Sequence, residues 1–296
     1  MYSGTTLTKF SGRVMGAHQK IDRVSRRHLK LLMPGDKAFP KISAILQFEG
    51  RDGPDGIKRK SPAHNEPWHY YDPFDETDTQ LLTLIEGHHT QLVHELRFGS
   101  GERAAFEAAW LAHAIVDGLT PAHHYPYESE LSKLRQGSKQ DRTTIRKKII
   151  IPGETVTEVI GNNWKMWGGK GLMTTHGTFE WGVASMLKPL KLTEALPSAA
   201  DVELLCDTGI VAIFKRAAHE IALLDMYGRY YRKGWTPRLA HQVRTFLAPT
   251  IVKTVTLAWH GALLDAMQIT RSRPVGAILV MPPELAQKPV KEGENT

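Results

Sequence analysis

The sequence predicts an all-α fold, a multi-helix bundle, from three observations. Helical periodicity, in which apolar residues recur every three or four positions, runs through several long blocks. Alternating runs of β-branched residues, which are typical of strands, are nearly absent outside 148–151 and 155–160. The connection between the second and third blocks is short, as in antiparallel helix pairs. Together these features predict about six helices packed against one another.

The first three helices are predicted from their end signals. Ser11 can cap a helix over 11–33, and a Pro-Gly pair ends it. The second helix covers 77–98, and the third, 101–117, follows after a turn of about three residues, which predicts an antiparallel pair. The candidate N-caps and the C-terminal stop of the second helix are Asp75, Thr77, Asp78 and Gly99.

Three more helices complete the set, over 172–190, 198–231 and 237–268. Two long stretches interrupt the helical pattern and are expected to be irregular. The first, 39–73, is rich in Gly, Pro, Asp and His and is expected to be an ordered loop. The second, 126–170, is an insertion that carries seven basic and three acidic residues before position 151.

The composition is that of a folded globular protein. Of the 296 residues 41% are hydrophobic and 23% are charged. The single cysteine, Cys206, rules out a disulfide framework and a thiolate-rich zinc ribbon. The longest apolar run, 274–283, has about half the length of a membrane span, so no transmembrane segment is expected. We therefore expect one helical domain over 1–281 and a disordered tail over 282–296.

The net charge of +7 favours binding to nucleic acid, to a membrane surface or to a phosphate-bearing substrate. More than half of it lies in the first part of the 126–170 insertion. We expect this arm to recruit an anionic substrate or to contact a membrane peripherally, with a solvated surface excursion as the alternative. The N-terminus lacks the apolar core of a secretory signal, so a cytoplasmic or peripheral-membrane location is expected, and export by a non-standard route stays open.

Two i, i+4 pairs of histidine and carboxylate are the most informative chemical feature. His113 and Asp117 are expected on one face of a helix, about one turn apart, where they can ligate one cation together. His176 and Glu180 repeat this arrangement on another helix, and helix bundles build interior metal sites in this way. A single pair often arises by chance, with the histidine hydrogen-bonded in the core, but two pairs favour a metal site.

Further candidate ligands lie outside these pairs. His123 follows a helix-breaking proline and can turn back over the face of His113. Asp55 in a GPDG turn and His69 in EPWHYYDP lie in rigid loops, where functional residues are common. His18 lies in the first helix, where a surface or capping role is the alternative. Imidazole and carboxylate ligands without thiolate suit zinc in a catalytic site.

Three residues near these candidates could contact a substrate. Trp68 and Tyr71 flank His69 and could stack on a base or line a lipid headgroup pocket, although aromatic core packing is the alternative. His124 adjoins His123 and could touch the substrate or support a metal ligand. The histidines of the second helix are instead expected to be solvated or in the core.

The order and spacing of the candidate ligands resemble the zinc-dependent phospholipase C family and its relatives, the single-strand-specific zinc nucleases. That family has a helical HxxxD motif followed six residues later by a histidine, and then HxxxE on the next helix. Upstream it has an aspartate fourteen residues before a histidine in an aromatic-Asp-Pro setting, and a histidine in the first helix. The resemblance covers about residues 11–268, and the eight matching positions are His18, Asp55, His69, His113, Asp117, His123, His176 and Glu180.

The resemblance implies a helical domain of the zinc-dependent phospholipase C type with a metal cluster of two or three zinc ions. In the family the third zinc uses the first-helix histidine, a shared aspartate and an N-terminal tryptophan. This chain has no such tryptophan, so Met1 or water would have to complete a third site, or that site is weak. The implied first zinc takes Asp55, His69, His113 and Asp117, and the second takes His123, His176 and Glu180.

The resemblance also implies a phosphodiesterase that hydrolyses phospholipids or related diesters, with Asp55 as the general base. Zinc lowers the pKa of a bound water to about 7, and two cations about 3.5–4 Å apart clamp the phosphate. The aromatic-Asp-Pro sequence after His69 favours the phospholipase type. One alternative is a single-strand nuclease, which the basic charge would suit. Another is a non-catalytic binding protein stabilised by zinc, against which an open coordination position argues.

Overall fold

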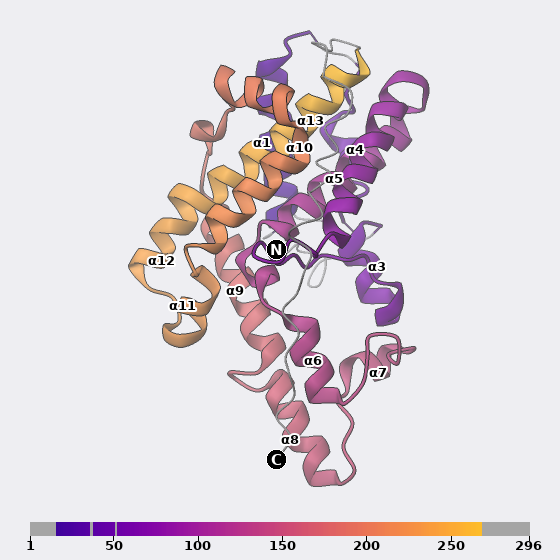
Figure 1. Ribbon diagram of the computed structural model, residues 1–296, viewed down its shortest axis with the longest axis vertical. Helices are drawn as coiled ribbons and strands as arrows, with labels where there is room; N and C mark the ends of the chain where they lie inside the picture. Colours follow the sequence, from indigo (N-terminus) through magenta and orange to yellow (C-terminus); the bar gives the residue numbers. More distant parts are fainter. Residues whose placement is uncertain (1–15, 36–37, 51, 268–296) are drawn as a thin grey trace, which may run out of the picture.

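The chain folds as an all-α protein, which confirms the predicted fold class. The computed structural model describes residues 16–35, 38–50 and 52–267, and every regular element within these ranges is a helix (Figure 1). Residues 282–296, expected to form a tail, and Met1, a possible ligand of a third zinc, lie outside the described residues. Long helices form a bundle at one end of the long axis, and the inserted segment projects at the other.

The helix α13 (Ala248–Ala266) lies at the centre of the bundle and packs against four long helices. It is apolar around most of its circumference, which is typical of a fully buried helix. The buried indole N–H of Trp259 donates to the carbonyl of Ala108, with 2.9 Å between nitrogen and oxygen. The four helices around α13 are α1 (Ala17–Leu32), α4 (Gln80–Phe98), α5 (Gly101–Gly118) and α10 (Ala199–Ala222).

The predicted pair of second and third helices is confirmed as α4 and α5, which pack along each other. The hydroxyl of Ser100 accepts a hydrogen bond from the N–H of Arg103 at 3.1 Å and so caps the start of α5. The first helix also ends as predicted, because Gly35 has a φ of 87° in the turn after it.

The predicted helix over 198–231 is wrong in one respect, because it is two helices. Asp225 adopts a left-handed conformation with a φ of 43° between α10 and α11 (Met226–Lys233). Within α10, Gly209 also leaves helical geometry, with a φ of 78°. The predicted helix over 237–268 is instead nearly continuous, from α12 (Pro237–Gln242) through a π-helical turn into α13.

The two stretches expected to be irregular contain short helices. In 39–73 these are α2 (Ile42–Ile45) and α3 (Pro54–Lys60). The β-branched run 155–160 lies mostly inside α8, because Thr155 and Glu158 form a reciprocal capping box at its start. The helices of the insertion are α6 (Tyr127–Arg135), α7 (Ile145–Ile149) and α8 (Val156–Trp167).

The insertion leads directly into α9 (Leu172–Leu187), which returns to the bundle. Among the described residues, every helix is too short or too polar to cross a bilayer.

Candidate metal centre

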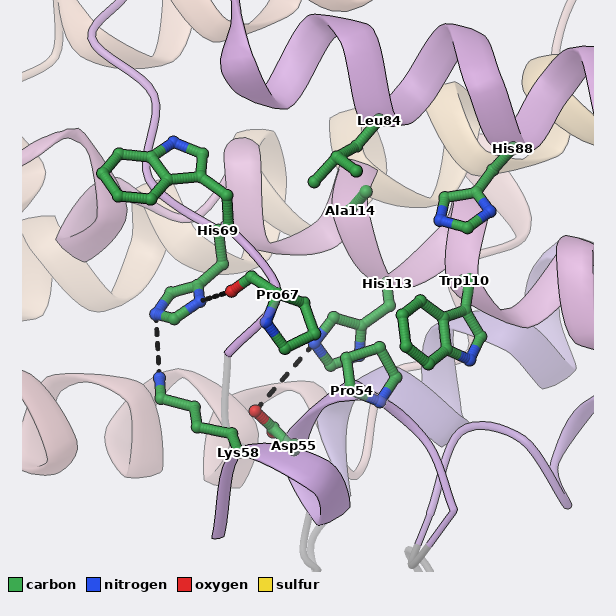
Figure 2. A pocket seen from close by; sticks show the side chains of 11 residues that line it. Pro54, Asp55, Lys58, Pro67, His69, Leu84, His88, Trp110, His113 and Ala114 are labelled. Carbon is green, nitrogen blue, oxygen red and sulfur yellow. Dashed lines mark hydrogen bonds and ion pairs between the residues drawn. The ribbon is translucent and has the colours of Figure 1, made fainter. Parts of the chain in front are cut away.

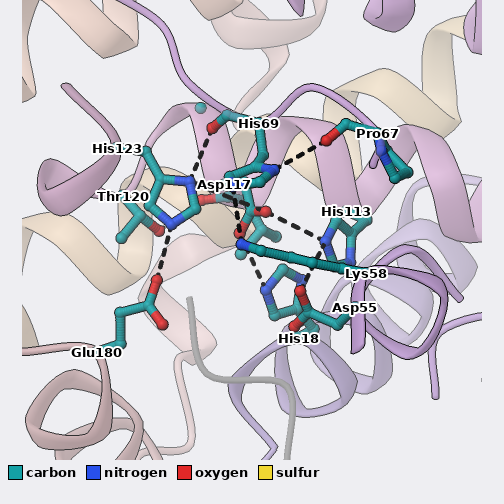
Figure 3. A network of polar contacts seen from close by, with 12 residues as sticks. His18, Asp55, Lys58, Pro67, His69, His113, Asp117, Thr120, His123 and Glu180 are labelled. Atoms are coloured by element: carbon teal, nitrogen blue, oxygen red, sulfur yellow. Dashed lines mark hydrogen bonds and ion pairs between the residues drawn. The ribbon is translucent and has the colours of Figure 1, made fainter. Parts of the chain in front are cut away.

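Five segments bring polar side chains together between the bundle and the inserted segment. They are α1, α3, α5, the 3₁₀ turn Pro121–His124 and α9, and the loop before α4 adds His69. Figure 3 shows their histidine and carboxylate side chains pointing toward one another. The convergence includes all eight positions of the predicted ligand set, although they play different parts.

The α5 helix provides His113 and Asp117, and its end directs His123 back to the same place. The helix ends at Gly118, where a Cβ atom would lie 2.4 Å from a side-chain carbon of Leu81. Glycine therefore allows α5 to end in close contact with α4. The chain then turns at Pro121, and the N–H of His123 donates to the carbonyl of Thr120 at 2.8 Å.

The α3 helix places Asp55 next to His113. Pro54 occupies the first turn of this helix, where its missing N–H is not needed. A Cβ atom on the preceding Gly53 would lie 2.4 Å from the carbonyl oxygen of Phe48, so only glycine lets the chain pass so closely. As a result, an Oδ atom of Asp55 lies 3.9 Å from Nε2 of His113.

The first candidate metal group consists of His18, Asp55 and His113, whose ligand atoms all lie within 4.8 Å of one another. Asp117 adjoins this group through both of its oxygens. Its Oδ1 lies 3.2 Å from Nε2 of His18, and its Oδ2 lies 3.2 Å from Nε2 of His113. The two imidazole rings stack with centroids 4.1 Å apart. Four ligand side chains thus face one small volume.

The second candidate group consists of His123, His176 and Glu180, again with ligand atoms within 4.8 Å. Glu180 Oε1 lies 2.7 Å from Nε2 of His123 and 3.2 Å from Nε2 of His176. The two groups adjoin, because Oδ2 of Asp117 lies 3.9 Å from Nδ1 of His123. Each group could therefore hold a metal ion next to the other.

The hydrogen bonds behind the histidines direct their Nε2 atoms toward the carboxylates. His123 donates from Nδ1 to the carbonyl of His69 at 2.7 Å, so in the neutral ring Nε2 carries a lone pair. Nδ1 of His113 donates to Glu49 at 2.9 Å, which leaves its Nε2 facing Asp117. In the neutral rings the Nε2 lone pairs would face carboxylate oxygens, and such a buried arrangement favours a cation between them. The residues therefore fit a bound metal.

Glu49 is a site residue that the sequence analysis missed. Its carboxylate is fully buried, and Oε1 contacts Nδ1 of both His113 and His18, at 2.9 and 3.2 Å. Burial and the neighbouring Glu49 also raise the pKa of Asp22, one turn after His18, well above its usual range. Glu49 lies in the stretch 39–73 without a spacing motif, so only the fold reveals its position.

Lys58 is the second residue that the sequence analysis missed. It extends from α3 into the centre, where Nζ donates to Nε2 of His69 at 2.8 Å (Figure 3). Nδ1 of His69 donates to the carbonyl of Pro67 at 2.9 Å. Burial and the Lys58 ammonium hold the pKa of His69 well below its usual range. His69 thus lies at the centre, but its ring nitrogens bind Lys58 and the backbone rather than joining either group.

The carboxylates of the centre remain ionised despite their burial. Burial raises the pKa of Asp117 and Glu180, but electrostatic and hydrogen-bond interactions with the surrounding histidines, His123 and His113 around Asp117 and His176 beside Glu180, outweigh it. Both pKa values are held well below the usual range. The pKa of Asp55 is lowered as well, since His113 and Lys58 outweigh the effect of burial.

A pocket opens onto the first group (Figure 2). Asp55, Lys58, His69 and His113 lie on one side of it, and Trp110 lies beside them. The side chain of Asp55 is 24% exposed, whereas that of Asp117 is 4% exposed. Asp55 is therefore the carboxylate that an incoming molecule would meet. Trp68, one of the predicted substrate contacts, also lines this pocket.

The other two predicted substrate contacts lie away from this pocket. Tyr71 is 3% exposed in the core and packs on Phe214, with ring centroids 5.3 Å apart. His124 turns away from His123, and its Nε2 donates to the carbonyl of Gly118 at 2.8 Å. Burial lowers the pKa of His124 to about 4, so the ring is neutral. Both side chains have packing roles that explain their positions.

The described residues therefore contain two adjoining groups of nitrogen and oxygen ligands beside an accessible pocket. Such an arrangement can bind two cations and present them to a small anionic molecule. Comparison of the chain with models of protein families, with curated proteins and with solved structures gives no match.

Proposed function

We propose that this chain is a zinc-dependent phosphodiester hydrolase of the phospholipase C type. The observation that carries the proposal is the position of Asp117 between the two metal groups. Its oxygens lie 3.2 Å from Nε2 of His18 and of His113, and Oδ2 lies 3.9 Å from Nδ1 of His123, the ring whose Nε2 faces the second group. A carboxylate in this position suits a pair of neighbouring cations, which is the usual device for hydrolysing phosphodiesters.

The donor set favours zinc over other common cations. Imidazole nitrogens and carboxylate oxygens suit zinc, whereas magnesium and calcium prefer oxygen ligands alone. His18 and His113 would hold one ion with Asp55 and Asp117, and the second ion would be held by His123, His176 and Glu180. When bound, zinc acidifies a water molecule and neutralises negative charge on the phosphate.

Asp55 has the position and the charge state of a general base. It is ionised at neutral pH because His113 and Lys58 lower its pKa. Its partial exposure in the pocket lets its carboxylate accept a proton from a water molecule beside the first group. The other carboxylates of the centre face histidine nitrogens and are less accessible.

Lys58 would contribute a fixed positive charge to substrate binding. Its ammonium lines the same pocket as Asp55 and lies 2.8 Å from Nε2 of His69. An anionic diester that enters the pocket would meet this charge together with the metals. The pocket has a volume of about 30 Å³, so a diester would lie at its mouth rather than inside it, next to Trp68, Trp110 and Leu84.

The test is metal reconstitution followed by assays on three diesters. The purified protein is stripped of metal with a chelator and reloaded with zinc, and the number of zinc ions bound per chain is measured by mass spectrometry. It is then assayed on phosphatidylcholine, bis(4-nitrophenyl) phosphate and single-stranded DNA. We expect at least two zinc ions per chain and turnover of phosphatidylcholine, whereas fewer than two tightly bound ions would contradict a two-metal centre.

Two variants, each with a matched control, test the roles of Asp55 and Glu180. Asp55→Asn should lower kcat at least about 100-fold, the usual contribution of a general base, while exposed Asp207→Asn should have no effect. Glu180→Gln should lose the ion of the second group alone, and exposed Glu220→Gln should keep both ions. Hydrolysis of DNA without phosphatidylcholine would indicate the nuclease alternative, and bound zinc without any turnover would indicate a structural role.

A further inference from the structure

The helix α8 has an apolar face that the rest of the protein does not cover. Val156, Ile160, Trp164 and Trp167 recur at spacings of four, four and three residues, so they form one stripe along the helix. Their exposed fractions are 78%, 65%, 73% and 43%. Met166 is the one buried residue of α8. Such exposure of two tryptophans on a single helix is unusual for a surface that faces only water.

The stripe continues onto the end of α7. The indole N–H of Trp167 donates to the carbonyl of Ile149 at 3.0 Å, which holds the two segments together. Asn163 adds two hydrogen bonds to the backbone of Ile151, so α8 cannot turn its apolar face inward without breaking them. Ile149 and Ile150 are 47% and 43% exposed. We call residues 145–167 the α7–α8 tip.

Basic side chains adjoin this apolar surface. Arg146 and Lys147 are exposed on α7, and both line a cavity of about 610 Å³ together with Ile150. Because Ile150 also belongs to the exposed apolar set, the cavity and the stripe are neighbours. A cationic cavity beside an apolar stripe matches the two layers of a lipid surface, anionic headgroups above acyl chains.

We propose that the α7–α8 tip docks on a membrane surface that contains anionic lipids. Tryptophan is enriched at the boundary between headgroups and acyl chains. The tip lies at one end of the long axis, so it can reach a flat surface without hindrance from the bundle (Figure 1). A second copy of the chain fits less well, because a symmetric contact would bring Arg146 and Lys147 close to their own copies.

The tip is connected to the metal centre in two ways. The α9 helix leads from the tip into the centre, where it carries His176 and Glu180. On the other side, Nζ of Lys148 pairs with Glu66 and donates to the carbonyl of Lys58. Docking would therefore hold the pocket at a fixed distance from the lipid surface. This inference deepens the proposed function by naming a lipid surface as the partner, but its test needs no turnover.

The experiment measures binding to vesicles by co-sedimentation. Vesicles of pure phosphatidylcholine are compared with vesicles that also contain phosphatidylserine, and the zinc-loaded protein is used throughout. Ile160→Glu is paired with Leu223→Glu, since both residues are 65% exposed and Leu223 lies outside the tip. Circular dichroism and zinc content show that both variants are folded.

We expect binding to the phosphatidylserine vesicles and a blue shift of tryptophan emission. Ile160→Glu should weaken binding at least about tenfold, because the free energy of burying one aliphatic side chain is lost. Leu223→Glu should change it less than about twofold. Arg146→Gln with Lys147→Gln should weaken binding to the anionic vesicles alone, by about fivefold for each charge.

Three results would overturn the proposal. They are no binding to either vesicle, equal loss in Ile160→Glu and Leu223→Glu, or a dimer of the wild-type chain that Ile160→Glu dissociates. The last result would make the tip a contact between copies of the chain. Vesicle binding without hydrolysis of any diester would contradict the proposed function and leave the docking surface intact.

Discussion

The Oε1 oxygen of Glu49 lies 2.9 Å from Nδ1 of His113 and 3.2 Å from Nδ1 of His18. One buried carboxylate thus contacts the Nδ1 atoms of two imidazoles, and both Nε2 atoms face Asp117. Carboxylates in this position orient metal-bound histidines and make them better ligands. Glu49→Ala should therefore weaken the first metal site about 10- to 100-fold, measured by competition with a chromophoric chelator.

A buried glutamate elsewhere provides the control for this prediction. Glu107 is 1% exposed and bonds Nδ1 of His88 at 2.6 Å, outside the metal centre. Glu107→Ala should destabilise the fold without changing metal affinity, and Glu49→Gln, which keeps an acceptor oxygen, should lose less affinity than Glu49→Ala. Equal metal affinity in all three variants would show that Glu49 does not orient the ligands.

Lys58→Met removes the positive charge that lines the pocket. We expect KM for an anionic diester to rise about tenfold, since a charge-assisted contact of about 1.5–3 kcal/mol is lost. Metal content should not fall, because the ammonium now lies 2.8 Å from a histidine nitrogen and competes with a cation for it. Steady-state kinetics and metal analysis measure the two effects. Lys60→Met on the same helix, with its side chain 48% exposed, should change neither.

His124 makes stability depend on pH. Its pKa is about 4 in the fold and 6.5 in the unfolded chain, so between these values the unfolded chain binds more protons. Stability from the neutral ring is complete above pH 6.5 and is lost as the pH falls toward 4. Between pH 6.5 and 4, the fall in the unfolding free energy of metal-free protein should be smaller in His124→Gln than in the wild type, by as much as about 3 kcal/mol. Urea unfolding at a series of pH values measures this difference. An unchanged pH profile in the variant would contradict a buried neutral ring.

Gly118 allows the close contact at the end of α5. A Cβ atom there would lie 2.4 Å from Leu81 and 2.6 Å from Phe214, so Gly118→Ala should cost about 1–3 kcal/mol of unfolding free energy. In the middle of α4, a Cβ atom on Gly87 would meet nothing within 4 Å. Gly87→Ala should therefore stabilise the protein by about 0.5–1 kcal/mol. Thermal and urea unfolding measure both values, and a stabilising Gly118→Ala would contradict the contact.

Periodicity and end signals were sufficient to predict the long helices and the two ligand pairs on them. His113 with Asp117, and His176 with Glu180, follow from one helical turn, which is a local property of the sequence. The break after α10 was not predictable in the same way, because Asp225 adopts its left-handed conformation in the folded context. Local signals therefore predict helices well and interruptions less well.

The rest of the centre depends on how loops fold over the bundle. Glu49 and Lys58 come from the stretch 39–73, where no spacing motif predicts which side chains turn inward. Gly53 lets this stretch pass close to the backbone of Phe48, and such a contact exists only in three dimensions. The helices of the insertion were missed for a similar reason, since capping by Thr155 outweighed the β-branched composition of α8.

The candidate ligands extend from His18 to Glu180 and come from five separate segments. Two bound cations would close long loops in a chain whose one cysteine cannot form an internal disulfide. Because the unfolded chain offers no preformed site, the binding free energy of the metals becomes folding free energy. The concentration of free metal would then govern how often α1, α3 and α9 separate, and with it the rate at which proteases degrade the protein.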